Sequence, residues 1–195
     1  MIAKCIGIAT LALLTLLGGR AVAGDGAANP RFRLVATDGT IITQDSHRGD
    51  WQVVLFGYTY CPDICPTTLA GLTLALRGMG AAGDRVKPLF ISVDPNRDTS
   101  RHLAEYLALF EGRTTGLTGT DEQVAAAARA FGARYAVEPG SGPDDYLISH
   151  TVALFVLDPQ GHLVDRFRGD DGPVPIRRRL CALVDPDGCG RAGPD

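Results

Sequence analysis

The chain has 195 residues, of which 45% are hydrophobic and 21% charged, and its formal net charge is −3. This composition is ordinary for one globular domain and excludes collagen, a coiled coil and wholesale disorder. No long basic run is present, so the sequence predicts no nucleic-acid partner.

The first 23 residues have the pattern of an export signal. Lys4 gives a positive start, residues 6–17 are apolar, and Ala21-Val22-Ala23 is typical of a cleavage site. The apolar run is shorter than the roughly 20 residues that span a bilayer. We therefore expect cleavage and export to the bacterial periplasm or cell envelope. An uncleaved signal that anchors the chain is the alternative, and membrane association otherwise arises only through partners.

The rest of the chain has no internal repeats and no second composition regime. We therefore expect one folded domain with short flanking segments. The predicted division is a signal peptide over 1–23, a flexible lead-in over 24–30, a domain over 31–186 and a tail over 187–195.

The first half of this domain alternates strands and helices. Asp38-Gly39 is a hairpin turn signal between two short strands. The continuous apolar run that follows favours a strand covered on both faces, and Pro66 is suited to the first turn of a helix. The predicted elements are strands over 32–35, 40–43 and 53–56, a helix from Pro66 to Met79, and a strand over 88–93.

The second half predicts two more helices before a strand pair and a final helix. Asp98 or Thr99 is suited to cap the first of these helices. Alternating strands and helices indicate an α/β fold with a parallel sheet, to which the last strand pair adds an antiparallel element. The predicted elements are helices ending near Phe110 and Phe131, strands over 151–157 and 163–168, and a helix from Pro175 to Leu183.

Cys61 and Cys65 carry the strongest chemical signal, because they lie between a buried strand and a helix start. Sites in α/β proteins lie beyond the carboxyl ends of strands. Pro62 and Pro66 disfavour a regular helix here, so we expect a tight turn with Cys65 near the helix cap, where its thiol pKa is lowered. Such a pair can bind a soft metal or close into a disulfide. A plain disulfide of an exported protein is the structural alternative.

Three segments together resemble the Sco/SenC family of copper-binding proteins. They are Tyr58-Thr59-Tyr60-Cys61-Pro62-Asp63-Ile64-Cys65-Pro66, then Ile91-Ser92-Val93-Asp94-Pro95-Asn96-Arg97-Asp98-Thr99, and finally Asp145-Tyr146-Leu147-Ile148-Ser149-His150-Thr151 with Asp158-Pro159-Gln160-Gly161. The resemblance implies a thioredoxin-like fold, with a central mixed sheet flanked by helices and an N-terminal β-hairpin extension.

The resemblance also implies a copper site built from Cys61, Cys65 and His150. Two thiolates and one imidazole form a soft, low-coordinate donor set that suits copper(I) and also binds copper(II). Zinc would want a fourth ligand. The remaining histidines of the mature chain sit in polar stretches, so we expect them on the surface; they are His47, His102 and His162.

The implied function is that of a chaperone, not an enzyme, which delivers copper to the dinuclear copper centre of cytochrome c oxidase during assembly. Its partners would be the oxidase subunit with that centre and a thioredoxin-like reductant, because a metal-free Cys61–Cys65 disulfide must be reduced before loading. The alternative is a thiol-disulfide oxidoreductase, which uses Cys61 or Cys65 to reduce the cysteines of the oxidase copper site or acts in envelope redox homeostasis.

Two departures from the family pattern concern neighbours of the ligands. Tyr60 stands where relatives often have histidine, and Ser149 stands where they often have an acidic residue. An acidic neighbour can orient a ligand histidine, so its absence bears on affinity or geometry rather than on ligand identity.

Two further groups are open to more than one interpretation. Cys181 and Cys189 flank a turn sequence, which favours a structural disulfide. Asp94, Arg97 and Asp98 follow a predicted strand at the edge that carries the cysteines. They form either a docking rim or a turn with a helix cap.

Overall fold

The structure is a computed structural model that describes residues 29–111, 113–142 and 145–188. The expected signal peptide and cleavage site lie outside the described residues, as do most of the lead-in and most of the tail. The domain boundaries therefore stay predictions. Within the described ranges, no helix is both long and apolar enough to span a membrane.

Seven strands form one mixed sheet in the order β2-β1-β5-β4-β3-β8-β9. The pairs β3–β4 and β4–β5 are parallel, whereas β1–β2, β1–β5, β3–β8 and β8–β9 are antiparallel. The strands are β1 (Arg33–Ala36), β2 (Ile41–Thr43), β3 (Trp51–Gly57), β4 (Val86–Ser92), β5 (Thr115–Thr118), β8 (Ala153–Leu157) and β9 (Leu163–Arg168).

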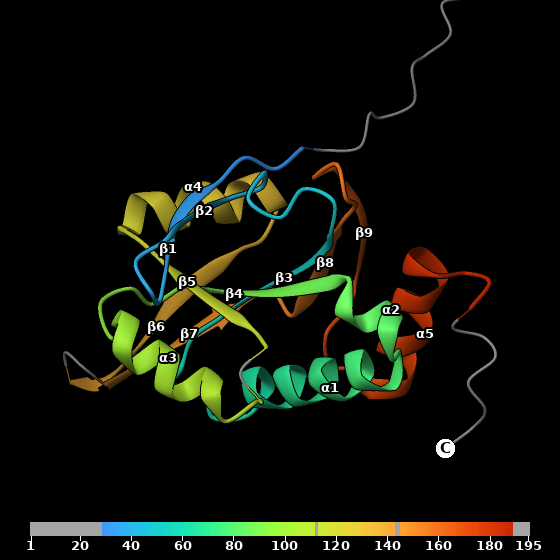
Figure 1. The fold of residues 1–195 in the computed structure, drawn as a ribbon. Coiled ribbons are helices and arrows are strands. Elements are labelled where there is room, and N and C mark those ends of the chain that lie inside the picture. The colour runs from blue at the N-terminus through green and yellow to red at the C-terminus, as the bar shows by residue number, and fades with distance from the viewer. Residues whose placement is uncertain (1–28, 112, 143–144, 189–195) are drawn as a thin grey trace, which may run out of the picture.

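Helices cover both faces of this sheet, with α4 on one side and α1, α3 and α5 on the other (Figure 1). Side chains of β3 alternate between the two cores: Val54 and Phe56 pack on the α4 side, and Val53 and Leu55 pack on the α1 side. Burial on both faces explains the continuous apolar run. The helices are α1 (Ile64–Gly78), α2 (Ala81–Asp84), α3 (Ser100–Ala108), α4 (Asp121–Phe131) and α5 (Pro173–Val184).

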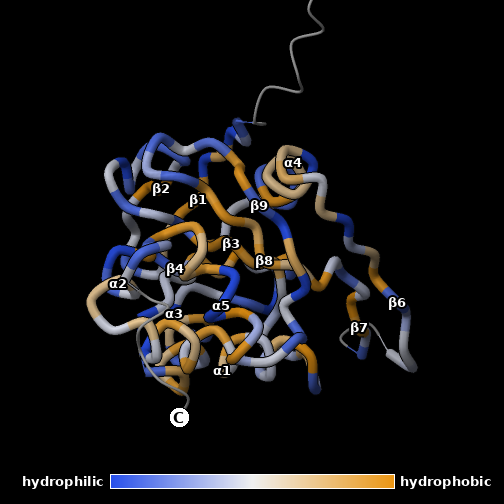
Figure 2. The backbone as a smooth tube through the Cα atoms, turned by 90° about the vertical axis from the view of Figure 1, so that its right-hand side faces the viewer, coloured by the Kyte–Doolittle hydropathy of each residue, from blue (hydrophilic) through white to orange (hydrophobic). Residues whose placement is uncertain are grey.

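A separate two-stranded sheet stands beside this core (Figure 2). It is the antiparallel hairpin of β6 (Tyr135–Gly142) and β7 (Asp145–His150). In the described part of the chain it pairs with no strand of the main sheet. An isolated hairpin of this kind is marginally stable by itself, so its position depends on contacts with neighbouring loops.

The structure confirms the expected mixed sheet, the flanking helices and the N-terminal hairpin. Most predicted boundaries differ from the observed ones by one or two residues. At the N-terminal ends, α1 begins at Ile64 instead of Pro66, α5 begins at Pro173 instead of Pro175, and β8 begins at Ala153 instead of Thr151. Proline is tolerated anywhere in the first turn of a helix because the missing N–H would have no intrahelical partner. The sequence interpretation also missed β5, β6, β7 and α2.

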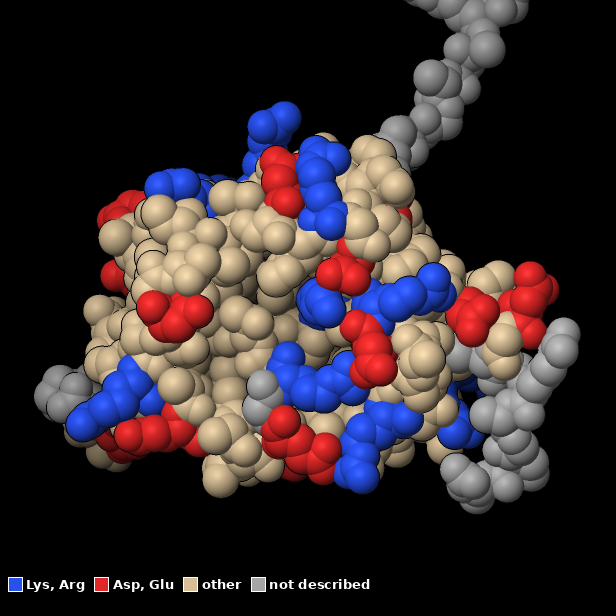
Figure 3. All heavy atoms as spheres, viewed as in Figure 1, with Lys and Arg blue, Asp and Glu red and all other residues tan. Residues whose placement is uncertain are grey.

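Basic and acidic side chains are interspersed on the face drawn in Figure 3. Several charged side chains of the described residues form ion pairs, as in the 2.6 Å contact between Arg179 Nε and Asp165 Oδ2. This face therefore carries no large patch of purely positive or purely negative charge.

The register of β3 and β4 decides where the site lies. Gly57 at the end of β3 is paired with Ser92 at the end of β4. The loops that follow these parallel strands therefore leave the sheet at the same edge. The first loop carries Cys61, and the second, residues 93–99, carries Asp94, Arg97 and Asp98.

Candidate metal centre

Gly57 allows the sulfur of Cys65 to lie against the end of β3. A Cβ atom on residue 57 would lie 2.9 Å from Cys65 Sγ and 2.9 Å from the ring of Phe90. These separations are too short for real side chains, so any larger residue would displace the sulfur or the ring. The close approach therefore requires glycine here.

Cys65 is the second residue of α1, after the N-cap Asp63. The expected position near the cap is confirmed, although Cys65 is helical despite the proline that follows it. Its backbone N–H donates to Cys61 Sγ at 3.4 Å. The sulfur thus satisfies one of the N–H groups that a helix leaves without a partner at its N-terminus.

The two thiols share one negative charge unequally. The pKa of Cys61 is lowered to about 4, because the Cys65 thiol, the His150 ring and backbone N–H groups donate to its sulfur, against the effect of burial. The pKa of Cys65 is raised, first by its hydrogen bond to the Cys61 thiolate and then by burial, so the expected lowering of the Cys65 pKa at the helix cap is wrong. Cys61 is therefore the thiolate and Cys65 the thiol, and both are free cysteines. Only 8% of Cys61 and 3% of Cys65 is exposed.

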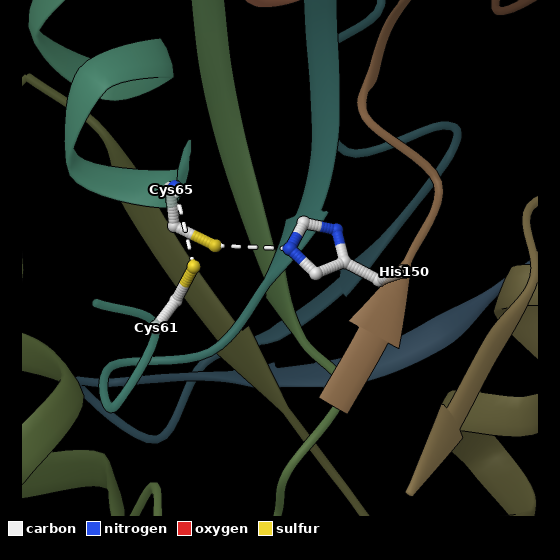
Figure 4. Close-up of side chains that lie close together, drawn as sticks. All are labelled: Cys61, Cys65 and His150. Carbon is white, nitrogen blue, oxygen red and sulfur yellow. Dashed lines mark hydrogen bonds between the residues drawn. The ribbon is translucent and has the colours of Figure 1, made fainter. Parts of the chain in front are cut away.

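His150 ends β7 and points its ring at the cysteine pair (Figure 4). Its Nε2 lies 3.1 Å from Cys65 Sγ, and its Nδ1 lies 3.3 Å from the carbonyl oxygen of Thr151. When the ring proton is on Nδ1, it is donated to that carbonyl and the Nε2 lone pair is directed at the sulfurs. An imidazole in this tautomer is ready to bind a metal.

The three predicted ligands therefore converge. The two sulfurs and a ring nitrogen of His150 all lie within 4.8 Å of one another. Two thiolates and one imidazole form a soft donor set that fits copper. A structural zinc site would need a fourth protein ligand. Among the residues described, no further histidine, cysteine or acidic group joins this cluster.

The other histidines lie at separate places. His102 is on α3, with its ring 5.3 Å from that of Tyr60, and His162 pairs with Asp158 at 3.1 Å. His47 follows β2, and burial lowers its pKa. All three are partly exposed, in agreement with the expected surface positions, and none of them belongs to the cluster of candidate ligands.

A cleft of about 400 Å³ adjoins the three ligands. Cys61 and His150 line it, whereas Cys65 does not. One wall is the cysteine loop and the other is the β6–β7 hairpin. Its other lining residues combine apolar side chains with two acidic ones, namely Tyr58, Pro62, Asp63, Ile64, Glu138, Leu147, Ile148 and Ser149.

The charged residues of loop 93–99 do not form an exposed docking rim. Asp94 is 2% exposed and Asp98 is not exposed at all. Thr99, not Asp98, caps α3 by accepting from the backbone N–H of His102. Burial raises the pKa of Asp98, although its hydrogen bonds to Ser92 and Thr59 oppose the shift. These residues are internal partners of the site.

Tyr58 and Tyr146 were missed as site residues. The hydroxyl of Tyr58 accepts from the backbone N–H of Ile148 at 3.1 Å, and its ring packs edge-on to His150. Both tyrosines lie in the segments that carry the family resemblance, but only the fold shows that Tyr58 contacts β7 and that Tyr146 contacts loop 93–99. Cys181 is disulfide-bonded. Cys189 lies outside the described residues, so the Cys181–Cys189 pairing stays a prediction.

Comparison with known proteins gives a family match over most of the chain. Residues 21–185 match the family model described as SCO1/SenC. The mouse protein named "Protein SCO2 homolog, mitochondrial" is 38% identical over 158 residues, which are 78% of this chain and 62% of that protein. The chain spans about half to three fifths of the length of the curated relatives it matches.

Solved structures agree with this match. The structure of Bradyrhizobium japonicum ScoI with copper bound has a TM-score of 0.72 and 33% identity, and the match covers 79% of this chain and 98% of that one. The crystal structure of yeast Sco1 has a TM-score of 0.75 and 31% identity, with 83% and 99% covered. The expected thioredoxin-like fold is confirmed.

The comparisons contradict the expected location. The matched relatives from mouse, cattle, human and budding yeast are all named as mitochondrial. The assignment to a bacterial periplasm or cell envelope rested on an apolar N-terminal segment, and such a segment does not identify the compartment. That prediction is wrong.

Proposed function

The chain belongs to the SCO1/SenC family, and from that premise we propose that it binds copper through Cys61, Cys65 and His150. We further propose that it delivers this copper to the dinuclear copper centre of cytochrome c oxidase during assembly of the oxidase. The observation that supports the proposal most strongly is the convergence of two sulfurs and one imidazole nitrogen within 4.8 Å.

The donor chemistry agrees with copper as the cargo. Thiolate and imidazole ligands suit copper(I), and the same set also binds copper(II). The structure of Bradyrhizobium japonicum ScoI, similar to this chain, was solved with copper bound. Both oxidation states are therefore included in the proposal.

Transfer proceeds by ligand exchange from the side of the cleft. Cys61 and His150 line the cleft, whereas Cys65 lies behind them and is 3% exposed. An incoming thiolate or imidazole of the partner would displace the His150 nitrogen or the Cys61 sulfur first and the Cys65 sulfur last. The copper keeps protein ligands throughout, so it is never released into water.

Loading requires both cysteines in reduced form. Oxidation of the pair removes two electrons and the one proton of the Cys65 thiol and closes the Cys61–Cys65 disulfide, so that neither sulfur is left as a thiolate for the metal. A thioredoxin-like dithiol would restore them by thiol-disulfide exchange and would itself become the disulfide. A reductant of this class and the copper-bearing oxidase subunit are the proposed partners.

A copper titration of the purified protein tests the site. The wild type should bind one copper per chain, and Cys61→Ala should lose that stoichiometry. His150→Ala should bind copper more weakly. His162→Ala is its matched control and should bind copper as the wild type does, because it removes a half-buried imidazole that lies away from the site. Unchanged stoichiometry and affinity in Cys61→Ala would refute the site.

Delivery is tested with the copper-loaded protein and the metal-free oxidase subunit. The visible absorption of the dinuclear centre should appear as the carrier loses copper. The control replaces the copper-loaded wild type by a mixture of Cys61→Ala and free copper. If the wild type binds copper but the centre forms equally well in this control, the carrier function is contradicted.

One observation favours thiol-disulfide exchange as a second candidate function. Cys61 is a thiolate with a pKa near 4, beside the free thiol of Cys65, and such a thiolate is a nucleophile. Replacement of His150 separates the two functions. If His150→Ala loses tight copper binding and keeps dithiol turnover, copper binding depends on the imidazole. If turnover collapses while copper binding survives, the redox function is favoured.

A further inference from the structure

Loop 93–99 carries no candidate ligand, yet it contacts both segments that do. It joins β4 to α3 and contains Asp94, Arg97 and Asp98. All three carry charge, but they are buried or nearly so, with only 13% of the Arg97 side chain exposed. Buried charges of this kind are retained only when they are paired and hydrogen-bonded.

Asp98 ties the loop to the cysteine segment. Its carboxylate accepts from the backbone N–H of Thr59 at 3.1 Å and from the Thr59 hydroxyl at 2.5 Å. A third bond comes from the hydroxyl of Ser92 at 2.6 Å. Thr59 is two residues before Cys61, so the loop and the cysteine segment are fixed to each other.

Arg97 ties the same loop to the histidine hairpin. Its Nη1 donates to the backbone carbonyl of Tyr146 at 3.0 Å, and its guanidinium carbon lies 3.5 Å from the centre of the Tyr146 ring. Asp94 completes the arrangement, since it accepts from Arg97 Nε at 2.5 Å and from the Tyr146 hydroxyl at 2.7 Å. The planar, charged fork of arginine is suited to stack and to donate at the same time.

The hairpin has few other attachments near the site. Its strands pair only with each other in the part of the chain that is described. Besides the contacts of Arg97, the backbone N–H of Ile148 donates to the Tyr58 hydroxyl, and the Ile148 side chain is buried. At the base of the hairpin, Thr151 N–H donates to the carbonyl of Arg134. Loss of the Arg97 contacts would therefore leave the strand that ends in His150 held by fewer contacts and more mobile.

We propose that Arg97 is a positioning residue for copper binding: it holds the β6–β7 hairpin at a fixed distance from the cysteine loop and so places the His150 imidazole beside the two sulfurs. This inference rests on the proposed copper site. It assigns part of the affinity to preorganisation, because a ligand that is held in place loses less conformational freedom on binding.

A double-mutant cycle on Cu(I) affinity, measured by competition with a chelator, tests the proposal. Arg97→Lys keeps the positive charge beside buried Asp94 and loses the fork and the stacking surface. We expect it to weaken copper binding about tenfold in the wild type. In the His150→Ala background, where the two thiolates still bind Cu(I), the same change should alter affinity less than about twofold.

The controls separate positioning from folding. Arg101→Lys makes the same substitution at an exposed arginine of α3, whose side chain is 89% exposed, and should leave affinity unchanged. Tyr146→Phe removes the bond to Asp94 and is the second test variant. Tyr106→Phe is its control, because the buried Tyr106 hydroxyl has no hydrogen-bond partner among the described residues.

Two further readouts keep the test independent of simple stability. In the metal-free protein, Arg97→Lys should speed hydrogen exchange of the Ile148 amide with no change in the β3 amides. In the copper(II) protein it should alter the electron paramagnetic resonance signal, which reports the ligand geometry.

The outcomes are distinguishable. If the wild type binds no copper, the proposed function fails. If the wild type binds copper and Arg97→Lys, confirmed as folded by circular dichroism, binds it equally well, the inference about Arg97 is overturned. An equal loss in the wild type and in the His150→Ala background also overturns it, because Arg97 would then act through the fold and not through His150.

Discussion

The two ligand-bearing segments are held in different ways. Cys61 lies in the loop between β3 and α1, and Cys65 lies in the first turn of α1; both are packed in the hydrophobic core and almost fully buried. His150 ends a two-stranded hairpin outside the main sheet, and a few side-chain contacts hold that hairpin. A rigid sulfur pair and a more weakly attached imidazole suit a protein that must bind a metal and then release it by ligand exchange.

This difference between the two segments predicts that removal of a cysteine and removal of the histidine reduce copper affinity by different amounts. Cys65→Ala should weaken Cu(I) binding by well over a hundredfold, because it removes the deepest sulfur. His150→Ala should cost less, on the order of tenfold to a hundredfold, because both sulfurs remain. Chelator competition measures both. Equal losses would show that the imidazole is as firmly part of the site as the sulfurs.

Hydrogen exchange compares the two regions directly in the metal-free protein. Amides of β6 and β7 should exchange roughly a hundredfold faster than those of β3 and β4, because few buried contacts protect the hairpin. Copper should slow the hairpin amides and leave the β3 amides unchanged. Equal protection in both regions before copper is added would contradict the comparison.

The rigidity of the cysteine region predicts a strong effect of Gly57→Ala. The added methyl group would meet Cys65 Sγ and the Phe90 ring at 2.9 Å, and such overpacking costs about 1–3 kcal/mol of unfolding free energy. Gly142→Ala in the hairpin is the matched control, because a Cβ there meets no described atom within 4 Å. Denaturant unfolding measures both changes. Similar destabilisation by the two variants would contradict the difference in rigidity between the cysteine region and the hairpin.

The unequal thiols predict the proton balance of copper binding. At pH 8, Cys61 is already ionised because its pKa is near 4, whereas the raised pKa of Cys65 keeps that thiol protonated. Binding should release one proton per copper, so affinity should fall about tenfold for each unit of decreasing pH. Calorimetry in buffers of different ionisation enthalpy counts the protons. Release of two would show that both thiols are protonated before binding.

The sequence predicted the cysteine region better than the hairpin. The run Val53–Phe56 is apolar throughout because both faces of β3 are covered, so its strand was easy to recognise. Residues 135–142 are mostly exposed and contain proline and glycine, which are typical of a loop, and β5 is short with a glycine in it. Neither segment has the alternation of apolar and polar residues by which a strand is recognised in a sequence.

The site was predicted only in part. Cys61, Cys65 and His150 were identified through the family resemblance, and the structure brings them together. The role of loop 93–99 was not predictable, because charged residues in a turn sequence suggest an exposed rim. Only the fold shows that Asp98 faces Thr59 and that Arg97 stacks on Tyr146.

X-ray absorption spectroscopy of the copper(I)-loaded protein identifies the atoms that bind the metal. We expect two sulfur neighbours and one nitrogen neighbour for each copper, with loss of the nitrogen in His150→Ala and no change in His162→Ala. A nitrogen that persists in His150→Ala, or a single sulfur in the wild type, would contradict the proposed copper site.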